Sequence, residues 1–310
     1  MTIYYISSGH KDGLGGNIRH MIKAHIYAIN KDYEFLNFSN PLIKHSKPFY
    51  KTFSIFSKLK KIGNIPDRSK IMIYGDYHRQ LIIDLIKKEF KFKNFDYIEE
   101  ETDHIYNEIN RLPYDQNLRE YHQKIFHERD NKKYNLCVPD KINIVLHIRR
   151  GDVLRKLQDG SRPDYSKRFT SDDFYIKTLK NLMKVLPKNF EIFLFSEGYE
   201  NEFEEYKKRW KNIRLQIDKE EWRYIINEEN YKHKEYNKAV ENMNKMIVTS
   251  INADIFLGSK SHLSHILAYL NENYCFFESF FCENLRTLKN MFLFEEVLNV
   301  IKEDTFGKKS

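Results

Sequence analysis

The chain has 310 residues, a length that fits two domains of ordinary size. Hydrophobic residues make up 41% of it and charged residues 31%, which excludes an intrinsically disordered chain. The formal net charge is +8, but the lysines are spread along the chain among acidic residues, in a composition typical of an AT-rich coding sequence. We therefore expect no nucleic-acid partner, since no basic patch with interleaved aromatic residues stands out.

Cysteine, histidine and hydropathy patterns narrow the class further. Three cysteines, Cys137, Cys275 and Cys282, have neither the even number of a disulfide framework nor the spacing of a zinc site, so reduced thiols in the cytoplasm are expected. The N-terminal residues lack the pattern of a signal peptide, and no apolar run of about 18 residues predicts a membrane span. No histidine has acidic or cysteine partners at ligand spacing, so no metal site is expected.

The first half of the chain opens with the elements of an α/β domain. Thr2–Ile6 predicts a short buried strand, and the glycine-rich segment Gly9–Gly16 predicts a loop. Apolar residues at helical spacing over Ile18–Ile29 predict a helix, and Tyr33–Phe38 predicts a second strand. This order of strand, loop, helix and strand is typical of an α/β fold.

Further along, a strand is predicted at Ile71–Tyr74, with Asp76 as the cap of a following helix that carries Leu81–Ile86. Asn117–Asp130 predicts another helix. A polar segment then marks the boundary between a domain of residues 1–138 and a domain of residues 139–310.

The second half alternates strands and helices with short loops. The predicted strands are Ile142–Ile148, Glu191–Phe195, Ile255–Leu257 and Tyr274–Phe277, and the predicted helices are Ser171–Val185 with Ser171 as its cap, Tyr199–Trp210, Asn237–Asn252, His262–Asn271 and Glu283–Ile301. Such alternation predicts a parallel sheet covered by helices on both faces.

The strongest functional signal follows the apolar strand that begins at Ile142. It reads His147-Ile148-Arg149-Arg150-Gly151-Asp152. Ligands of parallel α/β sheets bind beyond the carboxyl ends of the strands, and arginine offers a planar fork of donors that fits a phosphate. For these residues taken alone, a solvated strand end with a surface ion pair is the alternative.

A serine-rich segment gives a second signal. Ser259, Lys260 and Ser261 lie between a predicted strand and the helix that begins near His262. A helix N-terminus carries free N–H groups and the positive end of the helix dipole, so it suits a phosphate. Simple capping of the helix by Ser261 is the alternative.

The glycines before the first helix match a dinucleotide-binding fingerprint poorly. Ile18 stands where its third glycine would be, and Asn37 stands where an acid would end the second strand. We expect these glycines to let the backbone approach a cleft or to make a tight turn.

The segment His147–Asp152 matches the His-x-Arg-Arg-x-Asp motif of the α1,2-, α1,6- and protein O-fucosyltransferase superfamily. Other stretches resemble the α1,2-fucosyltransferase branch in the right order: Asp12–Asn17 is similar to its GGLGNQ segment, Ile73–Tyr77 to its GYxQ segment, Asp173–Tyr175 to its tyrosine motif, Phe195–Glu197 to its FSDD segment, and Ala253–Ser264 to its ADxxxxSxSSFS block.

This resemblance implies the GT-B fold, with two Rossmann-like domains facing a cleft. The C-terminal domain would hold the nucleotide sugar and the N-terminal domain the glycan acceptor. It implies an inverting, metal-independent transfer of fucose from GDP-fucose to a glycan hydroxyl, with no cofactor. A glycosyltransferase of this fold that uses another nucleotide sugar, a non-catalytic glycan-binding relative, and a nucleic-acid-binding protein suggested only by charge are the alternatives.

The resemblance also implies roles for individual residues. Arg149 would stabilise the negative charge that develops on the diphosphate, in place of a metal ion. Arg150 would position the phosphates or brace the loop, and His147 would orient the base or ribose, mostly through its backbone. Asp152 is the candidate catalytic base, and Asp159 is a looser one. The remaining site residues are Ser196, Glu197, Ser259, Lys260, Ser261 and His262 for the donor, and Gly13, Leu14, Gly15, Gly16 and Asn17 for the acceptor side of the cleft.

One position departs from the family. Related enzymes read the guanine edge with an acid on the helix before the serine-rich block, and Met246 stands at that position here. If the donor is GDP-linked, then Glu197, Glu241 or backbone carbonyls must replace that acid.

Overall fold

The computed structural model describes residues 3–7, 14–36, 70–74, 83–84, 96–99, 102–128, 131–161, 163–218, 235–279, 287–296 and 301. The chain divides into two compact units, Met1–Arg129 and Asp130–Ser310. The division lies before the boundary expected from the sequence. The reason is that the segment after Arg129 bonds to the second unit: Leu136 N donates to Thr249 Oγ1 over 3.1 Å, and Thr249 Oγ1 donates to Tyr134 O over 3.3 Å.

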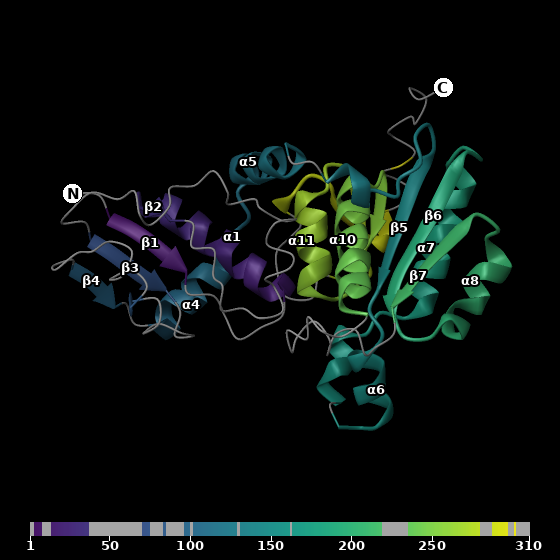
Figure 1. Ribbon diagram of the computed structural model, residues 1–310, viewed down its shortest axis with the longest axis horizontal. Helices are drawn as coiled ribbons and strands as arrows, with labels where there is room; N and C mark the ends of the chain where they lie inside the picture. Colours follow the sequence, from purple (N-terminus) through teal and green to yellow (C-terminus); the bar gives the residue numbers. More distant parts are fainter. Residues whose placement is uncertain are drawn as a thin grey trace. The chain divides into compact units, whose positions relative to one another are not determined.

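The first unit contains a four-stranded parallel sheet in the order β2-β1-β3-β4 (Figure 1). Its described elements are β1 (Ile3–Ser7), α1 (Leu14–Asn30), β2 (Glu34–Phe35), β3 (Lys70–Tyr74), β4 (Asp96–Glu99), α4 (Thr102–Arg111) and α5 (Gln116–His127). The predicted strands Thr2–Ile6 and Ile71–Tyr74 are present as β1 and β3, and the predicted helix Asn117–Asp130 is present as α5. Strand β4 and helix α4 were not predicted.

The glycine-rich segment differs from its prediction. Helix α1 begins at Leu14, so Leu14, Gly15, Gly16 and Asn17 are helical and do not belong to a loop. Gly15, Gly16 and Asn17 are buried, so packing of this turn outweighs the low helix propensity of glycine. Gly13 lies outside the described residues, as do Asp76 and most of its predicted helix.

The second unit contains a six-stranded sheet in the order β10-β9-β8-β5-β6-β7, in which all neighbouring strands are parallel. Strands β5, β6 and β7 are labelled in Figure 1. Its strands are β5 (Ile142–Ile148), β6 (Phe190–Glu197), β7 (Ile213–Asp218), β8 (Ile255–Leu257), β9 (Tyr274–Phe277) and β10 (Met291–Leu293). Its described helices are η3 (Lys132–Tyr134), α6 (Asp152–Gln158), η4 (Pro163–Arg168), α7 (Asp172–Val185), η5 (Glu200–Phe203), α8 (Glu204–Arg209), α10 (Tyr236–Asn252), α11 (His262–Leu270) and η7 (Phe294–Glu296).

The order of these strands is that of a Rossmann sheet. The first strand, β5, lies inside the sheet; β6 and β7 follow on one side, and β8, β9 and β10 follow on the other. Numbered from β5, the order is 3-2-1-4-5-6, and the direction of winding reverses between β5 and β8. The structure thus confirms the predicted α/β class.

One prediction for the second unit was wrong in its described part. The predicted helix Glu283–Ile301 is, over residues 287–296, a turn, the strand β10 and the short helix η7, because Met291–Leu293 pairs with β9; Ile301 is helical. The predicted helix Tyr199–Trp210 is confirmed, as the 3-10 helix η5 followed by the α-helix α8. Ser171 occupies the cap position of α7, but its side chain makes no capping hydrogen bond.

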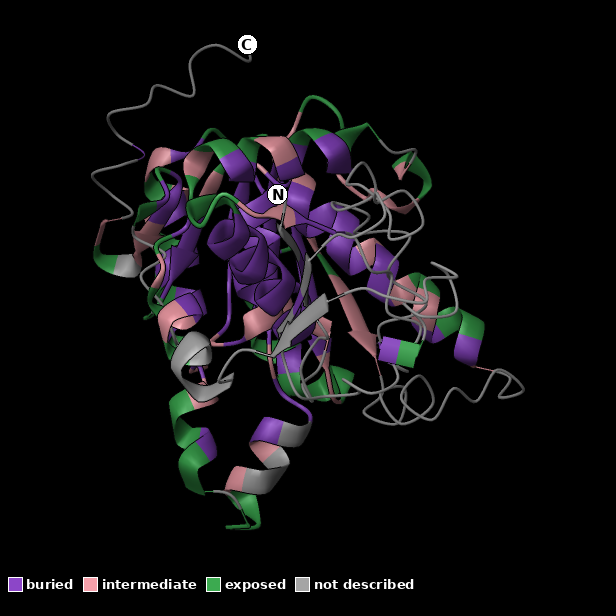
Figure 2. Cartoon of the chain, turned by 90° about the vertical axis from the view of Figure 1, so that its left-hand side faces the viewer, coloured by how far each residue is buried: buried purple, intermediate pink, exposed green. Residues whose placement is uncertain are grey.

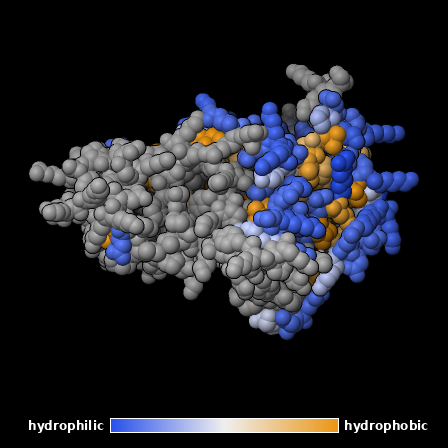
Figure 3. Space-filling model, viewed as in Figure 1, coloured by the Kyte–Doolittle hydropathy of each residue, from blue (hydrophilic) through white to orange (hydrophobic). Residues whose placement is uncertain are grey.

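The core of the second unit consists of the apolar strands and the inward faces of the helices (Figure 2). All seven residues of β5 are buried, and Trp210 is buried in the same core. The described surface in the view of Figure 3 is largely hydrophilic, with apolar side chains showing between the charged ones. Among the described helices, none is both long and apolar enough to cross a membrane.

Candidate functional site

The carboxyl ends of β5 and β8 lie side by side in the second unit. The two strands are parallel neighbours, with Leu146 opposite Leu257. Arg149 and Arg150 follow β5 directly, and Gly258–Ser261 follows β8. Because the winding of the chain reverses between these strands, this is the edge at which α/β sheets bind ligands. The structure therefore brings the arginine pair and the serine-rich segment to one edge of one sheet.

A network of buried side chains joins the two segments. His147 Nδ1 lies 2.7 Å from Ser264 Oγ, and Ser264 Oγ lies 2.9 Å from Ser259 Oγ and 3.2 Å from Ser261 Oγ. The Ser261 hydroxyl also accepts a hydrogen bond from Ser264 N over 3.1 Å, so it caps α11. These hydroxyls bond to one another, and Ser264, which links all three partners, was not among the predicted site residues.

His147 is buried and neutral. Burial, together with the positive charge of Arg149, lowers the pKa of His147 to about 3. Its main-chain oxygen accepts a hydrogen bond from Tyr175 Oη over 3.1 Å. These two contacts of His147 fix the end of β5 against α11 and α7.

The two neighbouring arginines have different surroundings. Arg150 is buried, and its guanidinium donates to Asp172 Oδ1 over 2.5 Å and to Thr170 O over 3.1 Å. It also lies 5.0 Å from the centre of the Phe169 ring. Arg149 is only partly buried. Arg150 therefore braces the start of α7, whereas Arg149 is the more exposed arginine of the pair.

The turn after the arginines packs against Glu197. Gly151 has a φ of +51°, a conformation that favours glycine, and a Cβ at this position would collide with the Glu197 carboxylate. Helix α6 begins at Asp152, whose side chain lies outside the described residues. Asp159 is exposed, and its carboxylate accepts a hydrogen bond from Ser161 N over 2.8 Å.

Two more strands contribute polar residues to the same edge. Ser196 Oγ donates to Ile148 O over 2.7 Å and so ties β6 to β5. Glu197 lies opposite Asp218 at the ends of β6 and β7. Asp218 accepts a hydrogen bond from Asn242 Nδ2 of α10 over 2.6 Å. Asp218 was missed because β7 was not predicted, and Asn242 was missed because its partner Asp218 was.

The other predicted donor residues occupy different positions. Lys260 pairs with Glu278 over 2.6 Å, and its N–H donates to Thr170 Oγ1 over 3.3 Å. His262 is the first residue of α11 and is half-buried. Met246 is buried within α10, whereas Glu241 is exposed on the same helix and pairs with Lys245. Of the two acids proposed to replace the guanine reader, Glu197 is the one shown to pack against the loop of the arginine pair.

The pKa of the Asp218 carboxyl group is raised above its ordinary value. Burial, and secondly the nearby Glu197 carboxylate, raise the pKa of Asp218 to about 6. The folded protein therefore binds a proton here more tightly than the unfolded chain. The stability that this proton contributes is present at low pH and is lost as the pH rises from about 4 to about 6.

We therefore expect Asp218→Asn to be more stable than the wild type only above this range. Asn keeps an oxygen that accepts from Asn242 but carries no charge to bury, so the gain should be about 1–2 kcal/mol at pH 7.5 and close to zero at pH 4. Urea unfolding of both proteins at the two pH values measures it. An equal difference at both pH values would show that the titration of Asp218 is not its cause.

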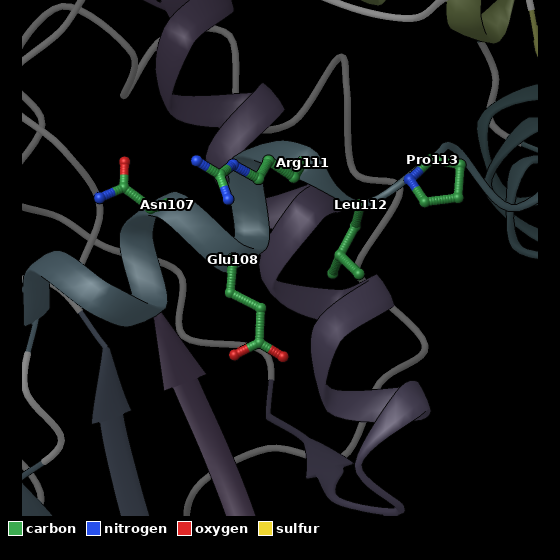
Figure 4. A pocket seen from close by; sticks show the side chains of 5 residues that line it. All are labelled: Asn107, Glu108, Arg111, Leu112 and Pro113. Atoms are coloured by element: carbon green, nitrogen blue, oxygen red, sulfur yellow. The ribbon is translucent and has the colours of Figure 1, made fainter.

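The described part of the first unit has a pocket of about 500 Å³ at the C-terminal end of α4 (Figure 4). Its lining residues are Asn107, Glu108, Arg111, Leu112 and Pro113. Glu108 pairs with Lys31 over 3.1 Å. The residues predicted for the acceptor side of the cleft, Leu14 to Asn17, do not line this pocket. Over the described ranges, no group of three or more His, Cys, Asp or Glu side chains is arranged to hold a metal ion.

No protein-family model and no curated protein matches this sequence. Among solved structures, the chain is similar to NodZ α-1,6-fucosyltransferase co-crystallised with GDP, with 11% identity, a TM-score of 0.43, and coverage of 87% of this chain and 92% of that one. It is similar to the same enzyme soaked with GDP-fucose, with 11% identity, a TM-score of 0.42, and coverage of 86% and 92%. It is also similar to fucosyltransferase NodZ from Bradyrhizobium, with 10% identity, a TM-score of 0.41, and coverage of 87% and 93%.

Proposed function

We propose that this chain is a glycosyltransferase that takes a sugar from a nucleoside diphosphate donor. The observation that carries the proposal is the position of Arg149. It is partly exposed and follows β5 directly, at the switch point of a Rossmann-ordered sheet. When the glycosidic bond to the donor breaks, negative charge grows on the leaving diphosphate. A fixed guanidinium at this point stabilises that charge in the transition state.

The specific reaction that we propose is an inverting transfer of fucose from GDP-fucose to a glycan hydroxyl. It is supported by the match of His147–Asp152 to the fucosyltransferase motif. In this reading the second unit holds the donor, the first unit contributes the acceptor side, and Asp152 removes the proton of the acceptor hydroxyl. The α11 N-terminus, with the N–H groups of its first turn, adds donors for the phosphates.

The reaction should persist in excess EDTA, because an arginine supplies the positive charge that a metal ion supplies elsewhere. We expect the same rate, within about twofold, before and after dialysis against EDTA, measured as release of nucleoside diphosphate. The control is a glycosyltransferase of known metal dependence in the same buffer. Loss of the activity with EDTA, and its recovery with magnesium or manganese, would contradict this prediction.

The proposal itself is tested with a panel of GDP-, UDP- and dTDP-sugars. The protein is incubated with each one, with and without mixed glycans, and the released nucleoside diphosphate is measured. Release from at least one donor supports the proposal. Binding of glycans without release from any donor would support the alternative of a non-catalytic glycan-binding protein.

A further inference from the structure

The strand order of the six-stranded sheet places one carboxylate, that of Glu197, at the end of its second strand. In Rossmann sheets that bind dinucleotides, an acid at the carboxyl end of the second strand hydrogen-bonds a ribose hydroxyl, while the phosphates lie at the end of the first strand. Counted from β5, the second strand of this sheet is β6. Its last residue is Glu197.

Glu197 also lies close to the proposed phosphate site. Strands β5 and β6 pair in register, with His147 opposite Phe195 and Ile148 opposite Ser196, so the next pair in that register is Arg149 and Glu197. Neighbouring strands are about 4.8 Å apart, a spacing that one nucleotide spans between its diphosphate and its ribose. The Glu197 carboxylate packs against Gly151, in the same loop as the arginine pair.

The neighbouring carboxylate is less suited to this role. Asp218 lies one strand further from β5 than Glu197 does. A carboxylate has two acceptor oxygens and no donor, so it matches the two hydroxyl donors of a cis-diol. A ribose presents such a diol, and a 2′-deoxyribose does not.

We infer that Glu197 binds the ribose diol of the donor, and that the donor is therefore a ribonucleotide. This inference rests on the proposed function. It narrows the donor class to GDP- and UDP-type sugars and makes dTDP-sugars poor substrates. Glu197 is then a residue that selects the sugar of the nucleoside, whichever base the donor carries.

The test compares matched ribo- and deoxyribonucleotides. Dissociation constants for GDP, 2′-deoxy-GDP, UDP and 2′-deoxy-UDP are measured by calorimetry with the wild type, Glu197→Gln, Glu197→Ala and the control Glu200→Gln. Glu200 is an exposed residue of the following turn, paired with Lys207. For the base that binds, we expect the ribonucleotide to bind at least about tenfold more tightly than its deoxy form in the wild type and the control.

In Glu197→Gln and Glu197→Ala this ratio should fall to about threefold or less. A residue with a merely structural role would weaken both forms alike and leave the ratio unchanged, and that result would overturn the inference. Equal binding of the ribo and deoxy forms by the wild type would overturn it while leaving the proposed function intact. Absence of binding by all four nucleotides would contradict the proposed function and, with it, this inference.

Discussion

Arg149→Lys is expected to lower the rate of sugar transfer about 100- to 1,000-fold and to leave the fold unchanged. Lysine keeps the positive charge but loses the planar fork of donors that follows the diphosphate oxygens as charge develops on them. Because Arg149 is only partly buried, the free energy of unfolding should change by no more than about 0.5 kcal/mol. Steady-state rates of nucleoside diphosphate release and urea unfolding curves measure the two effects.

The matched control for this substitution is Arg214→Lys. Arg214 is exposed on β7, pairs with Glu191 over 2.6 Å, and lies outside the loop of the arginine pair. Its substitution should leave the transfer rate within about twofold of the wild type. If Arg149→Lys turns over at a rate close to that of the wild type, then Arg149 does not stabilise the leaving diphosphate.

Arg150→Met is expected to act mainly on stability. It removes two hydrogen bonds from a buried guanidinium, to Asp172 and to Thr170 O, and a contact with the Phe169 ring. Because Asp172 is itself partly exposed, its charge remains solvated after the change. The expected loss is about 2–4 kcal/mol of unfolding free energy, measured by urea unfolding.

Arg214→Met provides the comparison for this effect. Arg214 also makes an ion pair and lies over an aromatic ring, that of Phe193 at 5.6 Å, but its side chain is 53% exposed. Glu191 keeps its ion pair with Lys141 over 2.8 Å after this change, so the loss should stay below about 1 kcal/mol. If Arg150→Met unfolds like the wild type and yet has no transfer activity, then Arg150 acts on the ligand and not as a brace.

The sequence predicted the strands of the second unit that are buried on both faces. Ile142–Ile148 and Ile255–Leu257 are continuous apolar runs, and such runs are typical of inner strands in parallel sheets. The half-exposed edge strand Ile213–Asp218 was missed, although its apolar residues alternate with polar ones. Met291–Leu293 was assigned to a helix, because its strand conformation depends on pairing with β9, a contact that a local pattern does not contain.

The location of the candidate site followed from the sequence, but the roles within it did not. The position of the arginine pair after an apolar strand was enough to place it at the carboxyl edge of the sheet. No local pattern distinguishes Arg150, which is buried against Asp172, from Arg149, which is partly exposed. In the same way, the bonds between Ser261, Ser264 and His147 depend on the packing of α11 against β5.

The central claim is that a nucleoside diphosphate binds beside Arg149 at this edge of the sheet. The most direct measurement is a calorimetric titration of the wild type and of Arg149→Lys with GDP, UDP and dTDP. We predict saturable binding by the wild type, with GDP at least about tenfold tighter than UDP or dTDP, and binding at least about tenfold weaker in Arg149→Lys. A preference for UDP would still be consistent with a glycosyltransferase, but it would contradict fucose as the transferred sugar. Absence of saturable binding for all three nucleotides, or equal affinity in the wild type and Arg149→Lys, would contradict the claim.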